Sequence, residues 1–178
     1  MNPMNNKFVF VSQRDTEYSE NGCGVAAILM QLKSASINTP NSFKEMAELL
    51  NIDSSASQKW GSKFKDSDYC FGIYPRDVTK YLDDYNISYI SISDAQKKAS
   101  WECLKILAKQ VPVMVGMKNE EDPKKWGEWG HWIVITNIDE ETVTYCDPYS
   151  KKNEKHTFEI SIANMKNEWD GYAIAIIT

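Results

Sequence analysis

The chain has 178 residues, of which 42% belong to the hydrophobic set and 25% are charged. This length and balance are typical of one compact unit, and we expect a single domain over residues 1–178. The formal net charge of −5 argues against a nucleic-acid-binding protein, because phosphate binding needs clustered lysine and arginine.

The N-terminus and the cysteines bear on the compartment. Residues 1–7 lack the basic start and apolar run of a secretory signal, and no apolar stretch has the length of a membrane span. We therefore expect a soluble cytoplasmic protein, with secretion by a signal-independent system left open. The cysteines at 23, 70, 103 and 146 form no Cys-x-x-Cys pair, so we expect reduced thiols, no metal and no cofactor.

The first half of the chain predicts helices. Apolar residues fill or recur at helical spacing in the segments 23–32, 43–50, 75–85 and 101–108. Ser42 and Glu45 form a capping box for the second of these helices, Pro75 suits the first turn of the third, and Ser100 is the predicted cap of the fourth.

The second half predicts strands. Short runs rich in β-branched and aromatic residues are separated by polar turns, at 111–117, 132–138, 142–146 and 172–177. Helices followed by strands indicate an α+β fold with a mostly antiparallel sheet. A catalytic pair would then join the two halves of the chain.

Cys23 is the candidate nucleophile. It lies between Gly22 and Gly24 at the predicted start of an apolar helix, where the helix dipole lowers the pKa of a thiol. None of the other three cysteines follows a glycine at a helix start, and a buried, inert thiol describes them better.

His131 is the candidate general base. The chain has two histidines, and a thiol nucleophile at neutral pH usually needs an imidazole nearby. His156 follows the charged stretch 151–155, which predicts a solvent-exposed loop. His131 opens an apolar strand, a position that is more often structural, but Cys23 as a partner favours a catalytic role.

Asp147 is the candidate for the residue that orients His131. The strands 132–138 and 142–146 predict a hairpin, and a three-residue turn at 139–141 would place Asp147 opposite Ile133, on the same face as His131. A two-residue turn would place them on opposite faces. Asp147 and Pro148 also suit a turn that simply ends the strand.

Two further groups complete the candidate site. The oxyanion of an acyl-transfer reaction needs donors, and the backbone N–H of Cys23 and the side chain of Gln13 are the candidates. Substrate-binding residues are sought next to these: Gly22 and Gly24 beside the thiol, and Trp126 and Trp129 before His131. The two tryptophans suit packing equally well, and Trp132 is expected in the core.

The ordered set of motifs resembles one known family. It comprises Gln13, the segment 21–27 (NGCGVAA), the block 130–136 (GHWIVIT) and the segment 145–148 (YCDP). Together these are similar to the C39-like group of papain-like cysteine peptidases, whose best-known bacterial members trim double-glycine leader peptides from bacteriocin precursors. Nine residues separate Gln13 from Cys23, which implies an insertion relative to the transporter-linked members.

The resemblance implies a papain-like fold and a Cys23–His131–Asp147 triad, with Gln13 in the oxyanion hole. It implies a cysteine peptidase that cleaves a peptide or protein, after small residues such as Gly-Gly, either in leader maturation or as a protease toxin with a cognate inhibitor or immunity protein. Another Cys-His amidohydrolase or acyltransferase on the same fold, and a catalytically inactive peptide-binding domain, remain alternatives.

Overall fold

The computed structural model describes residues 8–40, 42–52, 72–93, 97–118 and 130–178. The helices within these ranges are α1 (Cys23–Ser34), α2 (Phe43–Leu49), α4 (Pro75–Asp84), α5 (Lys97–Ala108) and α7 (Ile162–Glu168). The strands are β1 (Tyr89–Ile92), β2 (Val113–Met117), β3 (His131–Ile138), β4 (Thr142–Cys146), β5 (Thr157–Ser161) and β6 (Trp169–Ile176).

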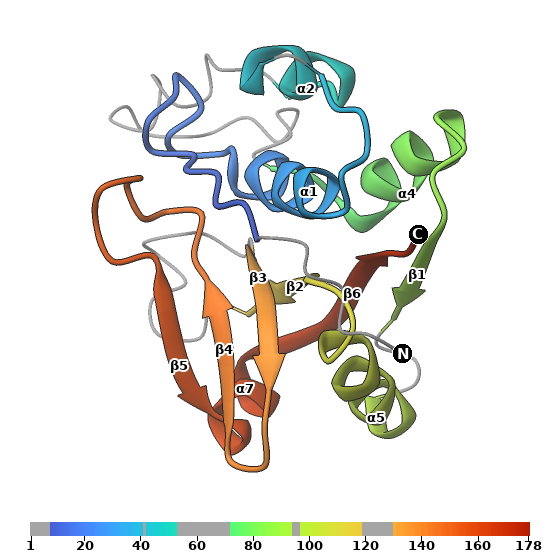
Figure 1. Ribbon diagram of the computed structural model, residues 1–178, viewed down its shortest axis with the longest axis vertical. Helices are drawn as coiled ribbons and strands as arrows, with labels where there is room; N and C mark the ends of the chain where they lie inside the picture. Colours follow the sequence, from blue (N-terminus) through green and yellow to red (C-terminus); the bar gives the residue numbers. More distant parts are fainter. Residues whose placement is uncertain (1–7, 41, 53–71, 94–96, 119–129) are drawn as a thin grey trace, which may run out of the picture.

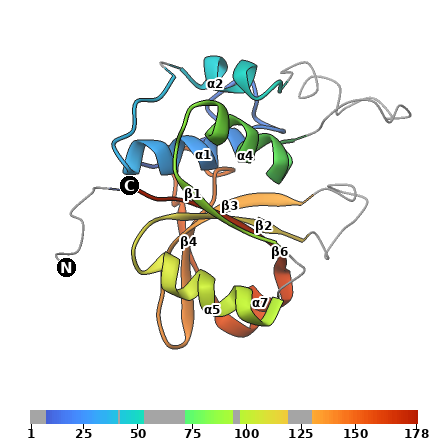
Figure 2. The same cartoon turned by 90° about the vertical axis from the view of Figure 1, so that its right-hand side faces the viewer.

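The strands form one antiparallel sheet in the order β1-β6-β2-β3-β4-β5. Helices α1, α2 and α4 lie on one face of the sheet and α5 and α7 on the other (Figures 1 and 2). The chain therefore builds an α+β fold in which the central strands are covered on both sides, as their uninterrupted apolar sequences require.

Two hydrophobic clusters fill the space on the two faces. The first surrounds α1 and includes Trp132 and Val134 of β3. The second lies under α5 and α7 and includes Ile133 and Ile135 of the same strand. Successive residues of a strand point to opposite faces, so β3 contributes to both clusters and is held between them.

Helix α1 is buried on most of its surface, as its apolar sequence predicts. Eleven of its twelve residues are buried, and Gln31 satisfies its amide by donating to the Ile174 carbonyl and accepting from the Ile176 N–H. These two bonds join α1 to the inner strand β6. The N-terminus of the helix, at Cys23, thereby takes a defined position relative to the sheet.

Three of the predicted helices begin close to where the sequence places them, and the Ser42 hydroxyl accepts from the Glu45 N–H as a capping residue does. The predicted cap at Ser100 is wrong. Helix α5 begins at Lys97, and the Ser100 hydroxyl donates instead to the Ser93 carbonyl. The pattern of apolar residues identified the helix but not its first turn.

Strands β2, β3, β4 and β6 overlap the four predicted strands. Strands β1 and β5 and helix α7 were not predicted from the sequence. Strands β1 and β5 are the edges of the sheet, have only four and five residues and are mostly exposed or half-buried, so they lack the apolar runs that identified the inner strands. Within the described residues, no helix has the length and apolarity of a membrane span.

Gly24 lies where the fold leaves no room for a side chain. A Cβ at this position would lie 1.7 Å from Cγ2 of Ile73 and 3.2 Å from Cδ1 of Trp132. Gly24→Ala should therefore destabilise the protein by about 1–3 kcal/mol through overpacking. Thermal unfolding measures the effect, and Gly72→Ala is the matched control because a Cβ there meets nothing within 4 Å. Equal unfolding temperatures for the two variants would contradict the prediction.

Candidate active site

Cys23 lies at the first position of α1, with its thiol directed towards the start of β3. The side chain is 9% exposed. Burial raises the pKa of the thiol, but the hydrogen bond and the charge of His131, together with the N–H groups of Trp132 and Gly24, outweigh burial and leave the pKa lowered. The surroundings therefore stabilise a thiolate at this sulfur.

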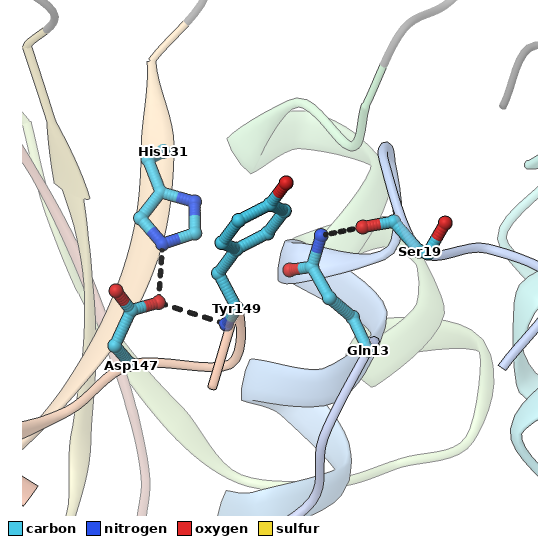
Figure 3. A network of polar contacts seen from close by, with 5 residues as sticks. All are labelled: Gln13, Ser19, His131, Asp147 and Tyr149. Carbon is cyan, nitrogen blue, oxygen red and sulfur yellow. Dashed lines mark hydrogen bonds and ion pairs between the residues drawn. The ribbon is translucent and has the colours of Figure 1, made fainter. Parts of the chain in front are cut away.

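His131 bridges the thiol and a carboxylate. Its Nε2 lies 2.7 Å from Oδ1 of Asp147 (Figure 3), which leaves Nδ1 for the contact with Cys23. Burial lowers the pKa of the imidazole, but the hydrogen bonds and charges of Asp147 and Cys23 dominate and raise it to about 10. The pair thus favours an imidazolium beside a thiolate.

Asp147 remains ionised beside this cation. Burial raises the pKa of its carboxyl group, but the hydrogen bond and charge of His131 and the N–H of Tyr149 outweigh burial and lower it. The Tyr149 N–H donates to the same oxygen that contacts His131, at 2.8 Å. Two partners therefore fix the direction of this carboxylate oxygen.

The hairpin that joins His131 to Asp147 has a tighter turn than predicted. Ile138 pairs with Val143, and the Asp139 N–H donates to the Thr142 carbonyl at 3.0 Å, which closes the turn around residues 140–141. The three-residue turn expected from the sequence is therefore wrong. Continued without interruption, the observed register would bring Asp147 opposite Val134, on the face away from His131.

A β-bulge reverses this shift. The ladder is irregular between Ile135 and Asn137, where Thr136 is one extra residue in β3. Beyond the bulge Val134 pairs with Cys146, so the next residue, Asp147, lies opposite Ile133. The bulge thus returns Asp147 to the side of His131, and the two side chains meet as the sequence analysis expected.

Gln13 lies at the same site. Its side chain is 1% exposed, and its Nε2 donates to the Ser19 carbonyl at 2.7 Å (Figure 3). Its main-chain N–H donates to the Pro148 carbonyl, which connects this segment to the residue after Asp147. Within the described residues, Oε1 of Gln13 has no hydrogen-bond partner.

These side chains open into one cleft of about 540 Å³. Its lining includes Gln13, Cys23, His131 and Asp147, together with Met117 at the end of β2 and Asp170 near the start of β6. The sequence-predicted candidates from four separate segments are therefore gathered in a groove large enough for an extended peptide.

Tyr149 is a residue of the cleft that the sequence analysis missed. Its ring lies between His131 and Gln13 (Figure 3), and the Arg14 guanidinium stacks on it, 4.8 Å from the ring centre. Its position two residues after Asp147, in the turn that follows β4, was the available signal.

The remaining candidates have different surroundings. Gly22 and Gly24 are buried, and a Cβ on Gly22 would meet the Tyr18 carbonyl at 2.8 Å, so neither position has room for a side chain. Contact of these glycines with the substrate stays a prediction. Trp126 and Trp129 lie outside the described residues. Trp132 is in the core, as expected, and its Nε1 donates to the Ile73 carbonyl.

His156 differs from the exposed loop residue that was expected. It lies in a loop, but its ring is partly buried and stacks on Phe10, with ring centres 4.0 Å apart. Its carbonyl accepts from the Asp147 N–H, so the main chain of His156 supports the site while its imidazole points elsewhere.

Comparison with known proteins identifies the family. The model of the peptidase C39-like family matches residues 5–174. No functionally curated protein shows significant sequence similarity to the chain.

Solved structures share the fold. The peptidase domain of Streptococcus ComA, a bifunctional ABC transporter of a quorum-sensing pathway, is 16% identical with a TM-score of 0.60, over 96% of this chain and 98% of that one. A double-glycine-motif protease of an AMS/PCAT transporter, in complex with the leader peptide, is 13% identical with a TM-score of 0.60, over 96% and 91%. A Bacillus anthracis protein assigned as a C39-like peptidase is 17% identical with a TM-score of 0.64, over 98% and 96%.

These structures, at low identity, support the α+β arrangement described above, in which a helix N-terminus meets the start of a sheet strand. The match over residues 5–174 establishes the relationship at the level of the sequence. The chain belongs to the peptidase C39-like family and is a cysteine-type peptidase.

Proposed function

We propose that the protein hydrolyses peptide bonds through a Cys23–His131–Asp147 triad. The observation that carries this proposal is the position of His131, which contacts the Cys23 thiol on one side and the Asp147 carboxylate on the other within a single cleft. A nucleophile, a base and a group that orients the base are what acyl transfer to sulfur requires.

In the first half of the reaction the Cys23 thiolate attacks the scissile carbonyl carbon, and the carbonyl oxygen becomes an oxyanion. The C–N bond then breaks, and His131 gives its proton to the leaving amine. In the second half His131 takes a proton from water, which attacks the thioester, and the C–S bond breaks to release the carboxyl product and the thiolate. Asp147 orients the ring in both halves and stabilises it whenever it is an imidazolium.

We assign the oxyanion hole to the N–H of Cys23 and to Nε2 of Gln13. Backbone N–H groups in the first turn of a helix have no intrahelical acceptor, which leaves the Cys23 N–H for a ligand. Nε2 of Gln13 carries two hydrogens, of which Ser19 accepts one. The second hydrogen remains for the substrate.

The proposed substrate is an extended peptide segment with small residues before the scissile bond, as in a leader peptide. The protease of the AMS/PCAT transporter was solved with a leader peptide, and it shares this fold. Burial of Cys23 supports the same choice, because a thiol that is 9% exposed is reached most easily by a main chain without bulky side chains.

The first prediction concerns cleavage. Cys23→Ala should abolish cleavage, because it removes the nucleophile, whereas Cys103→Ala on helix α5 should leave it intact. Cell lysate incubated with each form is analysed by sequencing of the new N-termini, which should follow small residues. Identical N-termini from the unsubstituted and Cys23→Ala forms would refute the proposed peptidase mechanism.

The second prediction concerns the thiolate. In His131→Ala the burial that raises the pKa of Cys23 remains while the main lowering interactions are lost, so alkylation of Cys23 by iodoacetamide at neutral pH should slow strongly. Mass spectrometry of the labelled peptide measures the rate. His156→Ala is the matched control and should label like the unsubstituted protein. Equal rates in all three forms would contradict the ion pair.

The third prediction concerns pH. Asp147 raises the pKa of His131, so Asp147→Asn should lower that pKa. The loss of peptidase activity at alkaline pH, which follows deprotonation of His131, should then begin at a lower pH than in the unsubstituted protein. A pH–rate profile of kcat with a cleaved peptide measures the shift. Asp139→Asn, in the turn of the same hairpin, should keep the original alkaline limb. An unmoved limb in Asp147→Asn would show that Asp147 does not act on His131.

A further inference from the structure

The segment between Gln13 and Cys23 folds back on the Gln13 side chain. Gly22 and Asn21 both donate from their main-chain N–H groups to the Tyr18 carbonyl, which brings the chain into the start of α1. One residue after Tyr18, the Ser19 carbonyl accepts from Nε2 of Gln13. A carbonyl only accepts hydrogen bonds, so this contact determines that the nitrogen end of the amide faces Ser19.

Within the part of the chain that the structure describes, the Gln13 amide is enclosed, with few hydrogen bonds to fix its direction. The side chain is 1% exposed, and Oε1 is unpaired among the residues that the structure describes. The hydrogen bond of this amide runs from Nε2 to the Ser19 carbonyl, so the direction of the amide depends on where the loop places that carbonyl.

Thr16 is the residue that closes the loop. Its hydroxyl donates to the Gln13 carbonyl at 2.7 Å and accepts from the Tyr18 N–H at 3.1 Å, while its own N–H also donates to the Gln13 carbonyl at 3.1 Å. One side chain thus joins the residue that carries the amide to the residue before Ser19. Loss of the hydroxyl breaks two of these three bonds.

Asp15 anchors the same loop to the other half of the site. Its Oδ2 accepts from the Lys152 N–H at 2.9 Å, next to the bond from the Gln13 N–H to the Pro148 carbonyl. The loop is therefore held to the segment that follows Asp147. Its position relative to His131 depends on this contact as well as on Thr16.

We propose that Thr16 is a positioning residue for the oxyanion hole: its hydroxyl holds the loop that aims Nε2 of Gln13 at the developing oxyanion. The inference rests on the role of Gln13 in the proposed function. It explains how the nine-residue separation of Gln13 and Cys23 is compatible with a preformed hole, because the additional chain length is folded into the turn that Thr16 closes.

Two small reagents separate the oxyanion hole from the thiolate. Acyl transfer from p-nitrophenyl acetate to Cys23 passes through an oxyanion, and its leaving group needs no proton from His131. Alkylation by iodoacetamide displaces iodide at a saturated carbon and forms no oxyanion. A change confined to the oxyanion hole should therefore slow acylation and spare alkylation, whereas a general disturbance of Cys23 should slow both.

The experiment compares Thr16→Val, Thr16→Ser, Gln13→Ala and the double variant, with the Cys23→Ala rate subtracted. Gln13→Ala should slow acylation by about 10²–10³. Thr16→Val should slow it on the order of tenfold with unchanged alkylation, and should have no further effect in the Gln13→Ala background. Thr16→Ser, which keeps the hydroxyl, should behave like the unsubstituted protein.

Two additional variants keep the test decisive. Thr79→Val removes an equivalent threonine-to-carbonyl bond, to Arg76 in helix α4, and should leave both rates unchanged. Asp15→Ala removes the other contact that holds the loop and should likewise slow acylation while leaving alkylation unchanged. It tests the loop independently if Thr16→Val does not fold.

The outcomes are distinguishable. Normal acylation by Thr16→Val, or parallel loss of acylation and alkylation, would overturn the role of Thr16 while Gln13 retains its own. Full acylation by Gln13→Ala would overturn the proposed oxyanion hole itself, and the inference with it.

Discussion

The contact between the Cys23 thiol and the His131 imidazole is the interaction on which the rest of the site depends. Each group alone would lose charge on burial, since burial raises the pKa of the thiol and lowers that of the imidazole. Together, the imidazolium lowers the pKa of the thiol and the thiolate raises the pKa of the imidazole. The Asp147 carboxylate is a second anion that contacts the imidazole. Such a thiolate–imidazolium pair can form only where helix α1 and strand β3 meet.

The fold provides this meeting point through two separate constraints. Burial of α1, with Gln31 bonded to β6, sets the position of the helix N-terminus over the sheet. The register of β3 against β4 sets the position of Asp147 relative to His131. The bulge at Thr136 belongs to the second constraint, because without it the tight turn would send Asp147 to the opposite face.

Much of this arrangement was predictable from the sequence because its signals are local. The small apolar residues after Cys23 indicate a buried helix, and the glycines beside it match two places where a Cβ has no room. The hairpin was predictable as a pair of strands. Its turn length and its bulge were not, since the two shifts of register cancel at Ile135 and Val134 and leave the pairing there as in a regular hairpin with a three-residue turn.

Other features depend on tertiary contacts that leave no pattern in the sequence. The edge strands β1 and β5 pair on one side only, and α7 has just seven residues. Thr16 and Tyr149 acquire their positions from a loop and a turn that pack against each other. From the sequence alone, polar residues in such segments cannot be distinguished from ordinary surface residues.

The proposed mechanism requires that His131 is held as an imidazolium between Cys23 and Asp147. Nuclear magnetic resonance of the protein with ¹⁵N-labelled histidine reports the protonation of His131, with His156 as an internal reference. We predict that both ring nitrogens of His131 stay protonated through neutral pH and into the alkaline range, and that Cys23→Ala lowers this pKa. A neutral His131 ring at neutral pH in the unsubstituted protein would contradict the ion pair and the mechanism built on it.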